Sequence, residues 1–385
     1  MSAAAPQYPL RRGRGIGARL PAAVGNRPSS AARAAGWLGR RGADGSRVHP
    51  PHRGRKIGQN APKGDREGVR MIRLAQAVFK GGGVKGIALV GGLAVAEELG
   101  WRWRAVAGTS AGALVAALVA AGYRAQELRE IVRDLDLRSF GDAAGLKVAS
   151  LLLHEGMFKG EKLLAEVDRL LSDRLGRPRV TFRDLPVACQ IVATDLTHRR
   201  MLVFPRDLAR PPYSMEDPYD FPVADAVRAS TAIPFFFQPY RLELPNGVRA
   251  TLVDGGLLSN FPVHLFQPIG GPACLPTFGF DLRGGDDLPQ PTDTPLELVQ
   301  AMVNTILSAR DLSARENQDY VRIIPIETAP YRTTQFDIDA DGKEELYRRG
   351  RAAAEAFFAD PETQRWLDQF AVRRALRARR LPLSV

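Results

Sequence analysis

The sequence predicts an α/β fold in which a mostly parallel central sheet is flanked by helices. Two observations predict it. From residue 75 the chain shows the order strand, loop, helix, strand, turn, helix, which is the order of parallel strands joined by helical crossovers. The second strand also meets its helix in a short, glycine-flanked turn, which is typical of a strand–helix elbow.

The first four elements follow from short apolar runs and their spacing. Ala75–Phe79 is predicted to be a strand that enters a glycine loop, and Gly86–Leu99 shows the 3.6-residue period of a helix. Arg104–Ala107 is the second strand, and a small-residue helix follows it to about Ala121. Ala105–Tyr123 carries no charge, but glycines interrupt it, so we predict a buried strand and helix rather than a membrane span.

Further elements are predicted along the rest of the chain. Helices are expected at Gly160–Leu175, Ala224–Thr231, Glu344–Phe358 and Pro361–Arg380. Strands are expected at Val187–Leu196, Arg200–Phe204, Arg249–Val253, Thr277–Leu282 and Tyr320–Pro325, the first two as a hairpin. Thr294 to Glu297 combines a capping box with a proline, so we expect a helix from there to about Asn317.

Charge divides the chain into two parts. Residues 1–70 hold 15 Lys and Arg against 3 Asp and Glu, whereas residues 71–385 hold 39 of each, so the net charge of +12 lies wholly in the first part. That part is rich in Arg, Gly, Ala and Pro without regular apolar periodicity, and we predict it to be disordered. Residues 71–385 form the predicted catalytic domain, whose balanced charge excludes a basic nucleic-acid surface.

Partners and location follow from the same features. No apolar stretch follows a charged start as in a secretory signal, and two distant cysteines, Cys189 and Cys274, fit a reducing compartment. We therefore expect a cytoplasmic protein without specific nucleic-acid binding. The arginines of Arg373–Arg380 or the N-terminal tail could give it peripheral contact with an anionic membrane.

The strongest chemical signal is Gly108-Thr109-Ser110-Ala111-Gly112, a Gly-x-Ser-x-Gly motif between a strand and a helix. A nucleophile elbow needs these residue types, because the serine backbone turns sharply and larger side chains at Gly108 and Gly112 would clash. The positive end of the following helix favours negative charge that develops beside Ser110.

A second signal is Gly81-Gly82-Gly83-Val84-Lys85-Gly86, which follows the first strand. It is not a dinucleotide fingerprint, because no acidic residue ends the second strand, and it is not a P-loop, because no Gly-Lys-Ser/Thr follows. Backbone N–H groups at a helix start can instead bind an oxyanion. We expect Lys85 to stabilise the loop rather than to react.

The serine needs a base, and two residues compete for this role. Asp254 ends an apolar strand before two glycines, where partial burial would raise the pKa of its carboxyl into a useful range. His264 would complete the chain order Ser110, Asp254, His264 of an α/β-hydrolase triad. It lies in an apolar stretch, however, where a packed histidine is expected.

Four ordered blocks between about Ala75 and Pro268 resemble the patatin-like phospholipase family. They are the glycine loop at 81–86, Gly-Thr-Ser-Ala-Gly at 108–112, Ala-Ser-Thr-Ala-Ile-Pro at 229–234, and Asp-Gly-Gly at 254–256 with Asn260 and Pro262. The resemblance does not extend to residues 1–70. Residues 269–385 are expected to complete or extend the core with further strands and helices.

The resemblance implies a three-layer patatin-like fold and a Ser–Asp dyad. Ser110 would be the nucleophile and Asp254 the base, and the N–H groups of Gly81, Gly82 and Gly83 would form the oxyanion hole. The supporting motif residues are Lys85, Gly86, Gly108, Gly112, Gly255 and Gly256.

The implied activity is that of a lipid acyl hydrolase that cleaves carboxylic esters of phospholipid, lysophospholipid or acylglycerol. The scheme requires no cofactor and no metal. Two alternatives remain: a general esterase or thioesterase with a Ser110-Asp254-His264 triad, and a non-catalytic lipid-binding protein on the same fold. Phe235-Phe236-Phe237 could line an acyl channel, although such a triplet is more often core.

Overall fold

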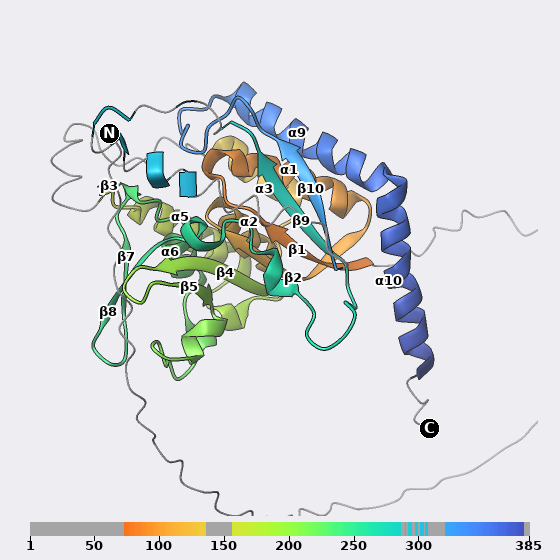
Figure 1. Cartoon of the computed structure of the whole chain (residues 1–385), viewed down its shortest axis with the longest axis horizontal. Coiled ribbons are helices and arrows are strands. Elements are labelled where there is room, and N and C mark those ends of the chain that lie inside the picture. The colour runs from red at the N-terminus through yellow and green to blue at the C-terminus, as the bar shows by residue number, and fades with distance from the viewer. Residues whose placement is uncertain are drawn as a thin grey trace, which may run out of the picture. The chain divides into compact units, whose positions relative to one another are not determined.

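A mixed sheet forms the centre of the computed structural model, which describes residues 73–135, 156–285, parts of 289–306, and 320–380 (Figure 1). The described strands of this sheet lie in the order β10-β9-β1-β2-β4-β8-β7, and β5 pairs with β4. Their bounds are β1 Arg73–Phe79, β2 Trp101–Thr109, β4 Ala188–Asp195, β5 Arg200–Phe204, β7 Tyr240–Glu243, β8 Arg249–Asp254, β9 Thr277–Arg283 and β10 Val321–Glu327.

Parallel pairing dominates the sheet, as predicted. Strands β10, β9, β1, β2 and β4 are mutually parallel, and β5, β7 and β8 enter through antiparallel pairs. Strands β3 (Gly156–Phe158) and β6 (Phe235–Phe237) form a separate small sheet, which the sequence did not predict. The protein therefore has the predicted α/β fold, with helices on a mostly parallel sheet.

Helices cover this sheet, and those around β1 and β2 position the site. The described helices are α1 (Ile87–Glu98), α2 (Ala111–Ala120), α3 (Ala125–Asp134), α5 (Glu161–Leu175), α6 (Val223–Ser230), α7 (Gly256–Ser259), α9 (Ala340–Ala359) and α10 (Pro361–Arg380). Short 3-10 turns occur at Gly83–Gly86 and Val263–Phe266. Helix α9 crosses α1 so closely that a Cβ at Gly350 would lie 1.8 Å from the Ala88 carbonyl oxygen.

Most predicted elements are present, with shifted ends. The uncharged run Ala105–Tyr123 divides into the end of β2 and helix α2, and no described helix is long and apolar enough to cross a bilayer. Helix α9 begins four residues earlier than predicted, because Asp339 caps it by accepting the Gly342 N–H at 2.8 Å. The prediction for residues 1–70 lies outside the described residues.

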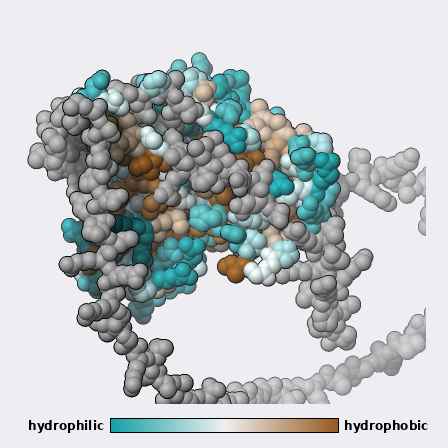
Figure 2. Space-filling view, viewed as in Figure 1, coloured by the Kyte–Doolittle hydropathy of each residue, from teal (hydrophilic) through white to brown (hydrophobic). Residues whose placement is uncertain are grey.

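The predicted capping box at Thr294 is confirmed. Thr294 Oγ1 accepts the Glu297 N–H at 3.2 Å, and Glu297 Oε2 accepts the Thr294 N–H at 2.9 Å. Part of the helix that follows lies outside the described residues. Of its described residues, Leu298, Met302 and Ile306 are exposed at a spacing that places them on one helix face. Elsewhere, the face shown in Figure 2 mixes small apolar groups with larger hydrophilic areas.

Candidate active site

Ser110 occupies a sharp turn between β2 and α2. Its backbone has φ 55° and ψ −124°, an unusual conformation for a residue other than glycine, and its side chain is buried. The flanking glycines are required here: a Cβ at Gly108 would lie 2.1 Å from the Gly112 carbonyl oxygen, and one at Gly112 would lie 2.1 Å from that of Phe79. The local geometry is that of the predicted elbow.

Asp254 ends β8 at the same edge of the sheet. It pairs with Ala193 of β4, whose preceding residue Val192 pairs with Thr109, the residue before the serine. The Asp254 carboxyl is 2% exposed, and its Oδ1 accepts the Gly256 N–H at 2.8 Å. The sheet register therefore brings together the two residues that the sequence proposed as nucleophile and base.

The environment of Asp254 favours its protonated form. Burial raises the pKa of this carboxyl to about 6, although the Ser110 hydroxyl and the Gly256 N–H act in the opposite direction by stabilising the charged form. Among the described residues Oδ2 has no hydrogen-bond partner of standard geometry, although the Ser110 hydroxyl lies close enough to lower the pKa of the carboxyl. Such a contact can tighten when a substrate binds.

Ser230, the last residue of α6, and Ala232, which follows that helix, hold the backbones of Ser110 and Asp254. Ser230 Oγ accepts the Ser110 N–H at 2.9 Å and donates to the Val192 carbonyl oxygen at 2.6 Å. The Ala232 carbonyl oxygen accepts the Asp254 N–H at 2.9 Å. The sequence singled out this segment only as a family block, and its contacts give the block a physical role.

The glycine loop lies directly against the serine. A Cβ at Gly81 would be 3.2 Å from Ser110 Cβ, and Gly83 has φ 53° with the Thr333 carbonyl oxygen 2.0 Å from its Cβ position. The Gly81 N–H donates to the Asn260 carbonyl oxygen at 3.0 Å. This differs from the prediction of three oxyanion donors, because within the described part of the chain only the Gly82 and Gly83 N–H groups of this trio have no backbone acceptor.

The remaining motif residues hold the loop in place. Lys85 is buried and donates to the Gly284 carbonyl oxygen at 3.1 Å, which agrees with its expected structural role. A Cβ at Gly86 would lie 2.9 Å from Ala111 Cβ, and one at Gly255 would lie 2.2 Å from the Val192 carbonyl oxygen. Gly256 supplies the N–H that binds Asp254.

His264 does not join this group. It lies in the 3-10 turn after Pro262, and no hydrogen bond between described residues connects its ring to Asp254 or Ser110. The expectation of a packed histidine is wrong, because the side chain is exposed. The turn directs it outward while its neighbour Val263 is buried.

A histidine–aspartate pair that the sequence reasoning missed lies elsewhere. His198 Nδ1 is 2.7 Å from Asp195 Oδ2, and the Tyr213 hydroxyl donates to the same oxygen at 2.7 Å. The signal was the three-residue spacing of Asp195 and His198 at a hairpin. None of these bonds reaches Ser110 or Asp254, so the pair anchors the β4–β5 hairpin. Among the described residues, no three His, Cys, Asp or Glu side chains are grouped to hold a metal.

A serine on a strand–helix elbow beside a buried aspartate and a glycine loop defines an α/β protein with a nucleophile elbow, and no histidine among the described residues is hydrogen-bonded to Ser110 or Asp254. The model of the family "Patatin-like phospholipase" matches residues 77–266. The chain belongs to the patatin-like phospholipase family.

The chain is similar to several known proteins. The uncharacterized protein YqhO of Bacillus subtilis is 36% identical over 299 residues, which cover 73% of this chain and 96% of YqhO. A cUMP-AMP-activated phospholipase of Escherichia coli is 28% identical over 192 residues, which cover 47% of this chain and 54% of that protein. The crystal structure of VipD from Legionella pneumophila has 18% identity and a TM-score of 0.45, and the match covers 77% of this chain and 67% of that one.

Proposed function

We propose that the protein is a lipid acyl hydrolase that cleaves carboxylic esters of phospholipid, lysophospholipid or acylglycerol through an acyl-enzyme on Ser110. Membership of the family supports hydrolysis of lipid esters in general. The single observation that supports this mechanism is the buried Asp254 carboxyl beside a serine on an elbow. The pKa of this carboxyl is about 6, and its Oδ2 has no hydrogen-bond partner of standard geometry among the described residues.

In the proposed mechanism, the Asp254 carboxylate accepts the Ser110 proton while Oγ attacks the ester carbonyl carbon. The carbonyl oxygen becomes an oxyanion, which the N–H groups of Gly82 and Gly83 stabilise. The tetrahedral intermediate collapses, the ester C–O bond breaks, and Asp254 returns the proton to the leaving alcohol. Water then loses a proton to Asp254 and attacks the acyl carbon. The bond from that carbon to Ser110 Oγ breaks, and Asp254 returns the proton to Oγ, which releases the carboxylic acid and restores the Ser110 hydroxyl.

The test is hydrolysis of a panel of phospholipids, lysophospholipids, acylglycerols and p-nitrophenyl esters by the full chain. Ser110→Ala and Asp254→Asn are each expected to abolish turnover while the far-UV circular dichroism spectrum stays unchanged. A fluorophosphonate probe should label the parent protein and not Ser110→Ala, because it reacts only with an activated serine.

His264→Gln is the matched control. The dyad mechanism predicts unchanged turnover, because His264 is exposed and no hydrogen bond between described residues joins it to Ser110 or Asp254. Loss of activity in His264→Gln, or retention of activity in Asp254→Asn, would contradict the dyad and favour the triad esterase. A parent protein that binds lipid vesicles but neither hydrolyses any ester nor reacts with the probe would instead be a lipid-binding protein.

A further inference from the structure

The glycine loop beside Ser110 offers fewer backbone donors than predicted, and Asn260 is the reason. The Asn260 carbonyl oxygen accepts the Gly81 N–H at 3.0 Å, so this donor is occupied. The chain fixes this position from the other side as well, because Thr109 Oγ1 donates to the carbonyl oxygen of the preceding residue, Ser259, at 2.8 Å. Asn260 is therefore held between the elbow and the glycine loop.

The Asn260 side chain lies in the space that glycine leaves open at position 81. A Cβ on Gly81 would be 2.2 Å from Asn260 Oδ1 and 3.2 Å from Ser110 Cβ. The terminal amide of Asn260 and the side chain of the nucleophile therefore lie next to the same point. A side chain at position 81 would push the amide away from it.

This amide is available to a substrate. The Asn260 side chain is half-buried, and within the described part of the chain its amide makes no hydrogen bond. An asparagine amide carries two N–H donors on its nitrogen, and rotation about the Cβ–Cγ bond can bring the nitrogen to the place of the oxygen. Asn260 can thus direct an N–H group at an atom beside Ser110 Oγ.

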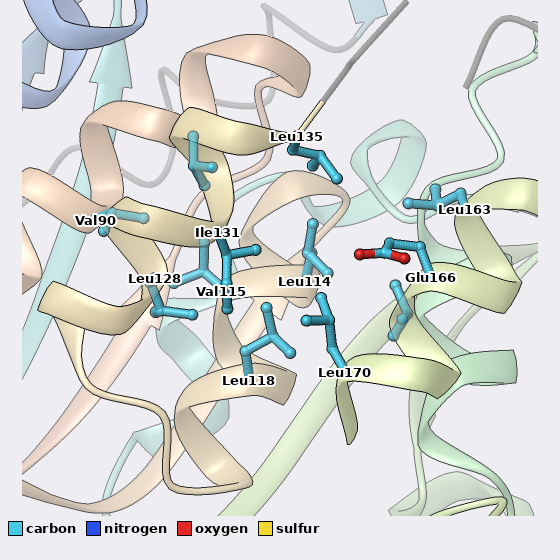
Figure 3. Close-up of a pocket in the computed structure, with 12 residues that line it drawn as sticks. Val90, Leu114, Val115, Leu118, Leu128, Ile131, Leu135, Leu163, Glu166 and Leu170 are labelled. Carbon is cyan, nitrogen blue, oxygen red and sulfur yellow. The ribbon is translucent and has the colours of Figure 1, made fainter. Parts of the chain in front are cut away.

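The apolar pocket between α1, α2, α3 and α5 contributes no comparable group. Its lining side chains are apolar apart from Glu166 (Figure 3). None of them belongs to the dyad, to the glycine loop or to the segment from 254 to 260. This pocket therefore supplies no donor to the reaction.

We propose that the Asn260 side-chain amide donates a hydrogen bond to the oxyanion that forms when Ser110 attacks the ester, as a third donor beside the N–H groups of Gly82 and Gly83. This inference rests on the proposed function. The oxyanion is bonded to the carbon that Ser110 Oγ attacks, so it forms within a few ångströms of Ser110 Cβ, where the amide lies. The hydrogen bond strengthens as negative charge develops on this oxygen, so it lowers the barrier more than it tightens binding of the ester.

The test replaces Asn260 by leucine, which has nearly the same shape and no N–H group on its side chain, and by alanine. With p-nitrophenyl butyrate at pH 8, where Asp254 is ionised, both variants should lower kcat by about a hundredfold or more and change KM little. Both should keep the far-UV circular dichroism spectrum of the parent. Asn246→Leu is the matched control, because Asn246 is an exposed asparagine in the turn between β7 and β8, and it should keep the parental kcat.

A second measurement separates a donor from a side chain that only holds the loop in place. A trifluoromethyl ketone whose alkyl chain matches butyrate accepts Ser110 Oγ at its carbonyl carbon and so presents an oxyanion. The corresponding secondary alcohol binds without reacting. In Asn260→Leu the inhibition constant of the ketone should rise by the factor by which kcat/KM falls, and that of the alcohol should not change.

Two results would overturn the proposal. One is a parental kcat in both Asn260 variants. The other is an equal loss of affinity for the ketone and the alcohol, since the side chain would then shape the site without binding the oxyanion. A parent protein that cleaves no ester and takes no fluorophosphonate label would refute the proposed function itself, and this proposal with it.

Discussion

Replacing Asp254 by asparagine should stabilise the protein, by an amount that grows as the pH rises from about 4 to about 6 and is constant above that. Burial raises the pKa of the native carboxyl from 3.8 to about 6, a shift of about two units. At 1.36 kcal/mol per unit, keeping this group charged in the folded state costs about 3 kcal/mol. Asparagine has a similar shape and never ionises, so this cost disappears.

The direction with pH follows from proton binding. Between about pH 4 and pH 6 the native carboxyl holds its proton while the unfolded one has lost it, so the native state binds more protons. The free energy of unfolding therefore falls as pH rises through this window. The stability of Asp254→Asn relative to the parent should grow over the same window, by about 3 kcal/mol, and then stay constant.

Urea unfolding of both proteins at a series of pH values from about 4 to 8 measures this difference in unfolding free energy. Effects of the lost carboxylate contacts that do not depend on pH cancel when the difference at one pH is compared with the difference at another. Ser110→Ala is the control: it keeps Asp254 and should keep the pH dependence of the parent, slightly steepened because the hydroxyl no longer favours the charged carboxyl. A difference between Asp254→Asn and the parent that is equal at pH 4 and pH 8 would refute the reasoning, because the carboxyl would then have an ordinary pKa.

Three further predictions concern turnover and binding. The active form of Asp254 is the carboxylate, so kcat/KM for p-nitrophenyl butyrate should rise with pH around a midpoint near 6, and a flat profile from pH 5 to 8 would contradict this. Ser230→Ala leaves the Ser110 N–H and the Val192 carbonyl oxygen without their hydrogen-bond partner, so it should lower the free energy of unfolding by about 1–3 kcal/mol. It should also reduce kcat more than it changes KM, and an unaltered kcat would show that the Ser230 hydrogen bond does not position Ser110. Replacing the five arginines of residues 373–380 by glutamine should weaken cosedimentation with phosphatidylserine vesicles while butyrate hydrolysis stays unchanged, and equal cosedimentation would exclude this helix as the membrane contact.

Local patterns in the sequence were enough to predict the elements that carry the site. A strand followed by Gly-x-Ser-x-Gly predicts the elbow because backbone sterics act over a few residues, and the structure shows the clashes that require Gly108 and Gly112. The local pattern of a strand end before two glycines made Asp254 a candidate base beside His264, and the resemblance to the patatin-like phospholipase family selected Asp254.

Contacts between distant residues could not be predicted in this way. The Gly81 N–H is occupied by a carbonyl 179 residues away in the chain, at Asn260, which no local pattern reveals. The hydrogen bond between the Ser110 N–H and Ser230 Oγ joins residues 120 positions apart. The exposure of His264 depends on the turn after Pro262. Sequence spacing predicts the residue types of a site, whereas donor assignments depend on which strands the sheet places side by side.

The contacts of the glycine loop determine which shortened fragments of this protein would keep that loop in its conformation. The family match ends at residue 266, and a fragment that stops there would keep both Ser110 and Asp254. It would nevertheless lose β9, whose Phe280 carbonyl oxygen accepts the Lys80 N–H at 3.2 Å, and Asp281, which pairs with the buried Lys80 side chain at 3.0 Å. It would also lose Thr333, which fixes Val84. A minimal fragment defined by the family match alone would thus hold the nucleophile and the base but not the strand that shapes the loop beside them.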